Sequence, residues 1–200
     1  MCGRYTLATI DADALATRFS MAEPPQAETV GRCNVCPTET IAVAGPAVAL
    51  RWGLRPFRSR GPAPINARSE TAARNGIFRR LHRCLVLADG WYEWLKAERP
   101  GGDRLPFRYT VDGGAPFAFA GLCDREAAII LTTTANAVCA PLHDRMPCVL
   151  ADAEAEAAWL DGELAAAELA PLGDARVTVA PANPAVNKAG VEGAELLSAP

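Results

Sequence analysis

RCLVLADGWYEWL, at residues 83–95, predicts two consecutive β-strands. Three more strand-like runs follow it: FRYTV (107–111), PFAFAGL (116–122) and AAIILTTT (127–134). Only short connections separate these runs, and GGDRLP (101–106) is a predicted turn. Antiparallel hairpins are the natural connection at such spacings, because a parallel pair needs a longer crossover. The stretch therefore predicts an antiparallel sheet of consecutive strands.

The sequence on either side of this stretch adds further strands. IAVAGPAVALRWGL (41–54) predicts two short strands around a Gly-Pro turn, and ARVTVAP (175–181) predicts a last strand. Residues 21–40 and 55–66 are rich in proline and polar residues and are expected to be loops.

Three helices are expected outside the sheet. The first is DADALATRF (11–19), the second begins at Ser69 or Thr71 and ends near Leu81, and the third is AEAEAAWL after Asp152. The predicted fold class is α+β, with a curved, barrel-like, mainly antiparallel β core and peripheral helices.

The length and composition fit one folded domain, residues 1–200. Hydrophobic residues make up 50% of the chain and charged residues 22%, close to the averages for globular proteins. No apolar run approaches the ~20 residues of a membrane span. The first residues lack the basic and apolar regions of a secretory signal, so the expected location is the cytoplasm. The seven cysteines are an odd number and are expected to be reduced there.

Positive charge is concentrated in one segment. Residues 51–83 contain nine arginines and one acid, whereas residues 152–174 contain seven acids and no base. If the fold keeps the arginines together, they form a positive face suited to phosphate, because a guanidinium can bind two oxygens at once. The arginines could instead pair with the protein's own acids, and charge alone does not separate these interpretations.

Cys2 is the first candidate for chemistry. Removal of Met1 would leave Cys2 with a free α-amine beside its thiol. An α-amine has a pKa of about 7.7–8.0, so part of it is neutral and nucleophilic at pH 7. With an aldehyde, such an aminothiol forms an imine, and the sulfur then closes a five-membered thiazolidine. A cysteine at the second position can also occur by chance.

Three other clusters of residues offer groups that orient an amine, bind phosphate or move protons. Asn66 can orient an amine, and Arg68 nearby suits a phosphate. Glu93 shares a strand face with Trp91, where burial would raise its pKa and suit it to proton transfer. Histidine titrates near neutral pH, which makes His143 a candidate acid or base. Each also has an ordinary structural explanation, as part of a helix cap, a strand carboxylate or a loop histidine.

Cys33 and Cys36 form a Cys-x-x-Cys pair, but it does not predict a metal site. A structural zinc site needs four ligands, and no second pair of this kind is found. Pro37 follows the pair in a predicted loop, unlike the helix start of a thioredoxin-like motif. We therefore expect neither a metal nor another cofactor.

The motifs, taken together and in order, resemble those of the SOS response-associated peptidase (SRAP) family. They are Met-Cys-Gly-Arg at the N-terminus, Cys-Asn-Val-Cys-Pro-Thr from Cys33, Trp-Gly-Leu from Trp52, Asn-Ala-Arg-Ser-Glu-Thr from Asn66, Gly-Trp-Tyr-Glu-Trp from Gly90 and His-Asp-Arg-Met-Pro from His143. A Val-Glu-Gly-Ala-Glu-Leu-Leu segment close to the C-terminus is similar too, so the resemblance covers nearly the whole chain.

The resemblance implies a sensor of abasic sites in single-stranded DNA. Such a protein forms a covalent thiazolidine DNA–protein crosslink, with a compact α+β fold and a positive DNA channel. Cys2 would be the crosslinking nucleophile, Asn66 would hold its α-amine, and Glu93 would move protons. His143 would assist opening of the deoxyribose ring. The implied partner is abasic single-stranded DNA bound by a monomer, without a metal or a membrane, and near the nucleoid when DNA is bound.

The resemblance also implies a set of DNA contacts. They are Arg4, Asn34, Trp52, Phe57, Arg58, Arg68, Thr132 and Arg145. Two departures stand out. The Cys33–Cys36 pair replaces residues that are often Tyr and Ala in the family. Arg58 and Ser59 stand where bacterial members can carry two tryptophans, so phosphate contacts are expected to matter more here.

Three other functions fit part of the pattern. An N-terminal-nucleophile amidotransferase also exposes a terminal Cys-Gly, but this chain has no room for the synthase domain usually linked to it. A non-covalent DNA-binding module would leave Cys2 without a role. A general peptidase would need a peptide pocket, which the motifs do not suggest.

Overall fold

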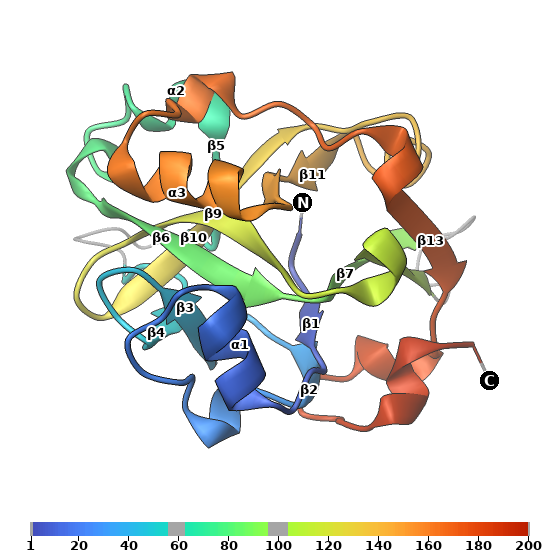
Figure 1. The fold of residues 1–200 in the computed structure, drawn as a ribbon. Coiled ribbons are helices and arrows are strands. Elements are labelled where there is room, and N and C mark those ends of the chain that lie inside the picture. Colours follow the sequence, from blue (N-terminus) through green and yellow to red (C-terminus); the bar gives the residue numbers. More distant parts are fainter. Residues whose placement is uncertain (1, 56–62, 96–103, 200) are drawn as a thin grey trace.

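The strands of this protein form two sheets that meet near the amino end of the chain (Figure 1). The computed structural model describes residues 2–55, 63–95 and 104–199. The strands are β1 (Tyr5–Leu7), β2 (Arg32–Val35), β3 (Thr40–Ala44), β4 (Ala49–Trp52), β5 (Asn66–Arg68), β6 (His82–Ala88), β7 (Gly90–Leu95), β8 (Leu105–Val111), β9 (Phe117–Cys123), β10 (Ala127–Thr134), β11 (Arg145–Pro147), β12 (Val149–Leu150) and β13 (Val177–Pro181).

The helices are short and lie outside the sheets. The α-helices are α1 (Ala12–Arg18), α2 (Ser69–Ala72) and α3 (Ala153–Asp161). Single 3-10 turns are η1 (Ala27–Thr29), η2 (Phe78–Arg80), η3 (Asp112–Gly114), η4 (Ala166–Glu168), η5 (Asp174–Arg176), η6 (Pro184–Asn187) and η7 (Ala194–Leu197).

Five strands close into a barrel. Their order is β10-β4-β3-β6-β9, and β9 pairs again with β10. The longest ladder in the ring runs from His82 opposite Cys123 to Ala88 opposite Phe117. β10 is parallel to β4 and β5, whereas the other pairings in the described part of the chain are antiparallel. The predicted α+β class with a barrel-like, mainly antiparallel core is confirmed.

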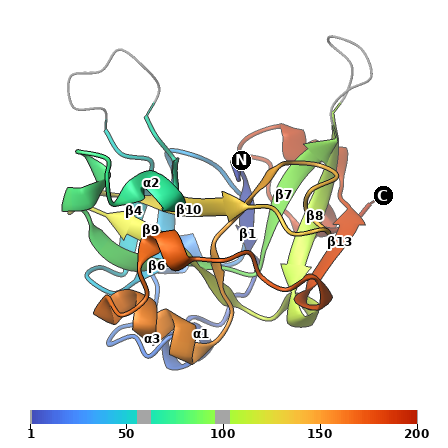
Figure 2. The same ribbon diagram turned by 90° about the horizontal axis from the view of Figure 1, so that it is seen from above.

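The second sheet carries the amino end. Its order is β13-β8-β7-β1-β2, so β1 is held on both edges. Tyr5 pairs with Trp91 of β7 on one side and with Val35 of β2 on the other. Figure 2 shows the amino end between the barrel and this sheet. The chain start is thereby placed at the junction of the two sheets.

Aromatic side chains fill the space between the sheets. Trp91 stacks on Tyr109 with ring centroids 5.0 Å apart, and its edge faces Phe117 and Phe119. Tyr5 of β1 also packs edge-on against Phe119. Because these rings are almost fully buried, they fix the position of β1 and β7 against the barrel.

A buried carboxylate ties β1 to β7 and β8. Asp89 accepts hydrogen bonds from Thr6 Oγ1 (2.6 Å) and from the backbone N–H of Thr9 (2.9 Å). It also forms a 3.3 Å ion pair with Arg108. Gly90 follows directly, and a Cβ there would lie 2.9 Å from Thr6 Oγ1, so this position has no room for a side chain. The network holds β1, the strand that follows Cys2.

Most predicted elements are confirmed. The runs between residues 83 and 134 form β6 to β10, 41–54 forms β3 and β4, and 175–181 contains β13. The first and third helices are α1 and α3, whose caps Asp11 and Asp152 accept from backbone N–H groups in the first turn.

Two predictions were wrong. Residues 21–40 are not all loop, because β2 forms there by pairing with β1, which its polar sequence does not predict. The second helix stops at Ala72. Asn75 ends it, since its side-chain oxygen accepts from the backbone N–H of Ile77 (2.9 Å) and so favours a turn.

Parts of two predicted loops lie outside the described residues. Residues 56–62 of the predicted loop 55–66 are outside, as are residues 101–103 of the predicted turn GGDRLP. Leu105 and Pro106, at the end of that predicted turn, belong to β8. Within the described ranges, no helix is long and apolar enough to cross a membrane.

Replacing Asp89 by alanine is expected to reduce the free energy of unfolding by about 3 kcal/mol, because Arg108 would lose its buried partner. Denaturant unfolding monitored by tryptophan fluorescence measures this loss. Asp161→Ala, at an exposed position, is the control and should change stability by less than about 0.5 kcal/mol. Equal losses in the two variants would contradict the assigned role of Asp89.

Candidate active site at the amino end

Cys2 lies just before β1 and is fully buried. Its thiol is 3.8 Å from the carbonyl oxygen of Arg4, which in turn accepts from the backbone N–H of Tyr92. Burial, and then the negative charge of Glu93, raise the pKa of the Cys2 thiol far above its usual range. The thiol is therefore protonated at neutral pH, and a base has to take its proton before it can act as a nucleophile.

Asn66 holds the backbone of Cys2. Its side-chain nitrogen donates to the carbonyl oxygen of Cys2 at 2.6 Å. The side-chain oxygen of Asn66 is buried and has no hydrogen-bond partner among the described residues. An unpaired buried acceptor is costly, so this oxygen is suited to receive a donor such as an amine at the chain start.

Glu93 lies on β7, two residues after Trp91 and on the same face of the strand. Only 7% of its surface is exposed. Burial raises the pKa of the Glu93 carboxyl, and the positive charge of the chain terminus acts in the opposite direction. A carboxyl with a raised pKa holds its proton to a higher pH than an exposed one, and the role of Glu93 in proton transfer stays a prediction.

His143 lies in the turn between β10 and β11. Its Nδ1 accepts a hydrogen bond from the backbone N–H of Arg145 (2.9 Å). In the neutral ring the proton is then on Nε2. Asp144 Oδ1 is 3.0 Å from the same Nδ1, so a ring that is also protonated at Nδ1 has a carboxylate beside it.

β5, β10 and β11 bring several of the predicted residues side by side. Asn66 pairs with Ile130 and Arg68 with Thr132, while β11 begins at Arg145 opposite Thr134. Arg68 is exposed and suited to bind an anion. Thr132 and Arg145 have partners within the protein, and their predicted contacts with DNA stay a prediction. Thr132 is fully buried and its hydroxyl donates to Ala67, and the guanidinium of Arg145 is bound to Glu70.

Arg4 and Asn34 bind each other. Arg4 Nη1 donates to Asn34 Oδ1 and to the carbonyl of Val186, both at 2.6 Å. Asn34 is fully buried, and its nitrogen donates to Lys188 and Val191. In this structure both residues fasten the start of β1 and β2 to the C-terminal segment, and their predicted contacts with DNA stay a prediction. Their positions were predicted as part of the site, but not these partners.

Trp52 is also fully buried, and its indole N–H donates to the carbonyl of Ile65. It therefore supports the segment before Asn66 and does not form an exposed surface. Phe57 and Arg58 lie outside the described residues.

Cys33 and Cys36 are buried free thiols. Burial raises the pKa of both, and the Cys36 thiol lies 3.3 Å from the carbonyl of Asn34. Within residues 2–55, 63–95 and 104–199, no three His, Cys, Asp or Glu side chains are grouped so that they could hold a metal ion.

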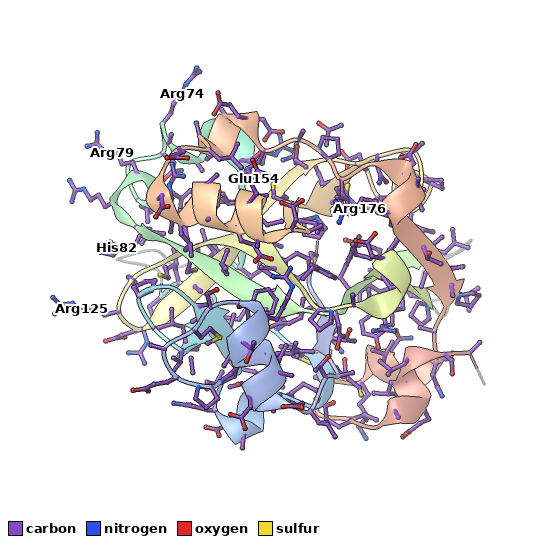
Figure 3. The ribbon with its side chains drawn as sticks, in the orientation of Figure 1. Arg74, Arg79, His82, Arg125, Glu154 and Arg176 are labelled. Atoms are coloured by element: carbon purple, nitrogen blue, oxygen red, sulfur yellow. The ribbon has the colours of Figure 1, made fainter. Side chains whose placement is uncertain are left out.

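The basic segment 51–83 divides into two parts. Arg83 donates to the carbonyls of Trp159 and Leu164 and stacks on the Trp159 ring, so it supports the barrel wall. Arg74 and Arg79 instead extend into solvent on the same side of the molecule as His82 and Arg125 (Figure 3). Arg83 thus binds backbone carbonyls and not the protein's acids, and phosphate binding by the exposed arginines stays a prediction.

A model of the family SOS response associated peptidase (SRAP) matches residues 1–189. The chain belongs to the SRAP family. The SRAP relatives include abasic site processing protein YoqW of Bacillus subtilis, 32% identical with 80% of each chain covered. Another is abasic site processing protein YedK of Escherichia coli, 30% identical over 98% of this chain and 99% of that one. A crystal structure of a Bacteroides thetaiotaomicron protein has the same fold, with a TM-score of 0.84, 21% identity and full coverage of both chains.

Two residues at this SRAP site were not predicted to have a role. Glu70 lies inside the Asn-Ala-Arg-Ser-Glu-Thr motif and binds Arg145, and Asp89 precedes the Gly-Trp-Tyr-Glu-Trp motif and anchors β1. In the sequence, both stand out only as acidic residues within or beside a motif in a strand-rich region. Their partners are distant in sequence, so the sequence gives no indication of these contacts.

The raised pKa of Glu93 gives stability a defined pH dependence. A carboxyl whose pKa is higher in the folded state contributes stability that is complete below its unfolded pKa and is lost as the pH rises through its folded pKa. Glu93→Gln removes this loss. The variant should therefore gain stability relative to wild type as the pH rises from about 4.5, by at most about 1.4 kcal/mol per pH unit.

Urea unfolding of both proteins at several pH values from 4 to 8 measures the difference. Glu163→Gln, at an exposed position, is the matched control and should follow wild type throughout. A Glu93→Gln variant whose stability difference does not change with pH would show that the Glu93 carboxyl is not perturbed.

Proposed function

We propose that this protein recognises abasic sites in single-stranded DNA and becomes covalently linked to them through Cys2. The observation that carries the proposal is the position of Cys2: its carbonyl is held by Asn66 at 2.6 Å and its thiol lies within the electrostatic reach of the buried Glu93. The relatives named abasic site processing proteins support the choice of substrate.

The chemistry starts with loss of Met1, which leaves the Cys2 α-amine free. The amine attacks the C1′ aldehyde of the ring-opened deoxyribose, and loss of water gives an imine. The Cys2 sulfur then adds to the imine carbon while the thiol proton is transferred, and the nitrogen becomes a ring amine. The sum is aminothiol plus aldehyde giving a thiazolidine and one water.

Glu93 is suited to the proton transfers. The buried thiol holds its proton, so sulfur attack needs a base beside it, and the Glu93 carboxylate can accept that proton. A protonated Glu93 can earlier assist departure of water during imine formation. Burial raises its pKa and so makes the protonated form easier to reach than in an exposed carboxyl.

Asn66 and His143 would act on the two reactants. The unpaired oxygen of Asn66 can accept a hydrogen bond from the Cys2 amine and direct its lone pair toward the aldehyde. His143, with Nδ1 occupied by the backbone, presents Nε2 for proton exchange with the sugar hydroxyl during ring opening. The open aldehyde is a minor form, so ring opening beside the waiting aminothiol raises the local reaction rate.

DNA attraction would come from the exposed arginines. Arg68 adjoins Asn66 in β5, and Arg74 and Arg79 extend from one side of the molecule (Figure 3). Phosphate binding of this kind is independent of base sequence and weakens with salt. It suits a protein that must search for a lesion without a base to recognise.

The test is an SDS gel of the protein, with Met1 removed, after incubation with a single-stranded oligonucleotide containing one abasic site. Wild type should give a stable, slower-migrating adduct, and Cys2→Ala should give none. Cys2→Ser keeps the amine but not the thiol, so its adduct should survive the gel only after borohydride reduction of the imine.

Two controls separate the rival functions. Cys36→Ala, another buried cysteine, should crosslink like wild type, and DNA whose abasic aldehyde has been reduced beforehand should not react. Equal DNA binding by wild type and Cys2→Ala with no adduct would favour a non-covalent DNA-binding module. Hydrolysis of glutamine or of foreign peptides without DNA crosslinking would favour the amidotransferase or peptidase.

A further inference from the structure

Two of the three nitrogens of the Arg145 guanidinium bind groups within the protein, and the third, Nε, is buried without a hydrogen-bond partner among the described residues. Nη1 donates to Glu70 Oε1 at 2.6 Å, and Nη2 donates to Glu70 Oε2 at 2.9 Å. Nη2 also donates to the carbonyl of Thr132. Only 11% of the Arg145 side chain is exposed. A bidentate ion pair of this kind fixes the direction of both side chains.

This contact joins the elements that carry the site. Glu70 belongs to α2, which directly follows β5 and therefore Asn66. Thr132 lies on β10, opposite Arg68 of β5. The backbone N–H of Arg145 donates to Nδ1 of His143. The ion pair thus connects the side of the site that holds Cys2 with the turn that holds His143.

We propose that Glu70 is a positioning residue that acts through Arg145 to set the orientation and tautomer of the His143 imidazole, an inference that rests on the proposed function. Glu70 holds the Arg145 side chain against α2 and β10. The Arg145 backbone N–H then donates to His143 Nδ1 and favours the ring proton on Nε2, against the Asp144 carboxylate 3.0 Å away, which favours a proton on Nδ1. This role differs from that of a DNA ligand, which the sequence predicts for Arg145.

Loss of the contact should affect the reaction rate more than DNA affinity. Without Glu70, the Arg145 guanidinium keeps only its contact with Thr132, and the start of β11, where Arg145 pairs with Thr134, loses its tie to α2. The turn that holds His143 can then shift. Displacement of a reacting group by about 1 Å can lower a rate about 100-fold. If Glu70 instead only masked a phosphate-binding Arg145, removing the charge of Glu70 would tighten DNA binding and would not slow the reaction.

The kinetic test compares full-length wild type and Glu70→Gln, both with Met1 removed. Single-turnover crosslinking is measured over a range of abasic oligonucleotide concentrations, and the Kd for the same oligonucleotide without the lesion by fluorescence anisotropy. We expect a roughly tenfold lower maximal rate and a Kd changed by less than about twofold. Glu70→Asp, which keeps the carboxylate, should recover part of the rate.

Glu156→Gln is the matched control. Glu156 also forms a bidentate ion pair, with Arg18, and both contacts are 2.8 Å long. This pair joins α1 to α3, away from His143. This variant should lose stability and keep the wild-type crosslinking rate. A tighter Kd with an unchanged or faster rate for Glu70→Gln would overturn the positioning role in favour of masking.

A second readout needs no DNA. The chain has two histidines, so nitrogen-15 NMR of the imidazoles can follow His143 with the exposed His82 as internal reference. Neutral His143 should be an Nε2–H tautomer in wild type and Glu156→Gln, and a mixture in Glu70→Gln. If the tautomer in Glu70→Gln is the same as in wild type, the inference is overturned, whether or not wild type forms an adduct. If the tautomer changes as expected but wild type forms no adduct, only the proposed function is overturned.

Discussion

The short strand β1 keeps its place at the amino end only because it is held on both edges. Three residues form too few backbone hydrogen bonds to stay in place alone, so β7 and β2 fix them from either side. The buried Asp89 adds hydrogen bonds to Thr6 and Thr9. The result is an amino end that is as well packed as the core, with Cys2 fully buried at its start.

The site near Cys2 keeps polar groups in costly positions. Glu93 is almost fully buried, and the Asn66 oxygen lacks a partner in the described structure. Such groups lower stability, and the surrounding aromatic packing of Trp91 and Tyr109 offsets that cost. Groups retained at such a cost are characteristic of a site selected for chemistry rather than for stability alone.

Sequence patterns predicted the elements with strong periodicity and missed those formed by distant pairing. The apolar runs of β6, β9 and β10 were evident, as were the capped helices α1 and α3. β2 and β5 were not, because Arg32–Val35 and Asn66–Arg68 contain polar residues and become strands only through their neighbours. The motifs indicated the candidate site around Cys2, Asn66 and Glu93, but the ion pair between Arg145 and Glu70 depends on contacts that no local pattern contains.

The strand β10 pairs with β4, β5, β9 and β11, and two of these partners run parallel to it. Asn66 meets Ile130 and Arg51 meets Ala127, so closing the ring requires contacts between segments far apart along the chain. Each such loop has to be closed against chain entropy before its contacts form. A topology of this kind has a high contact order, so the protein will fold slowly for its size, with barrel closure a late event.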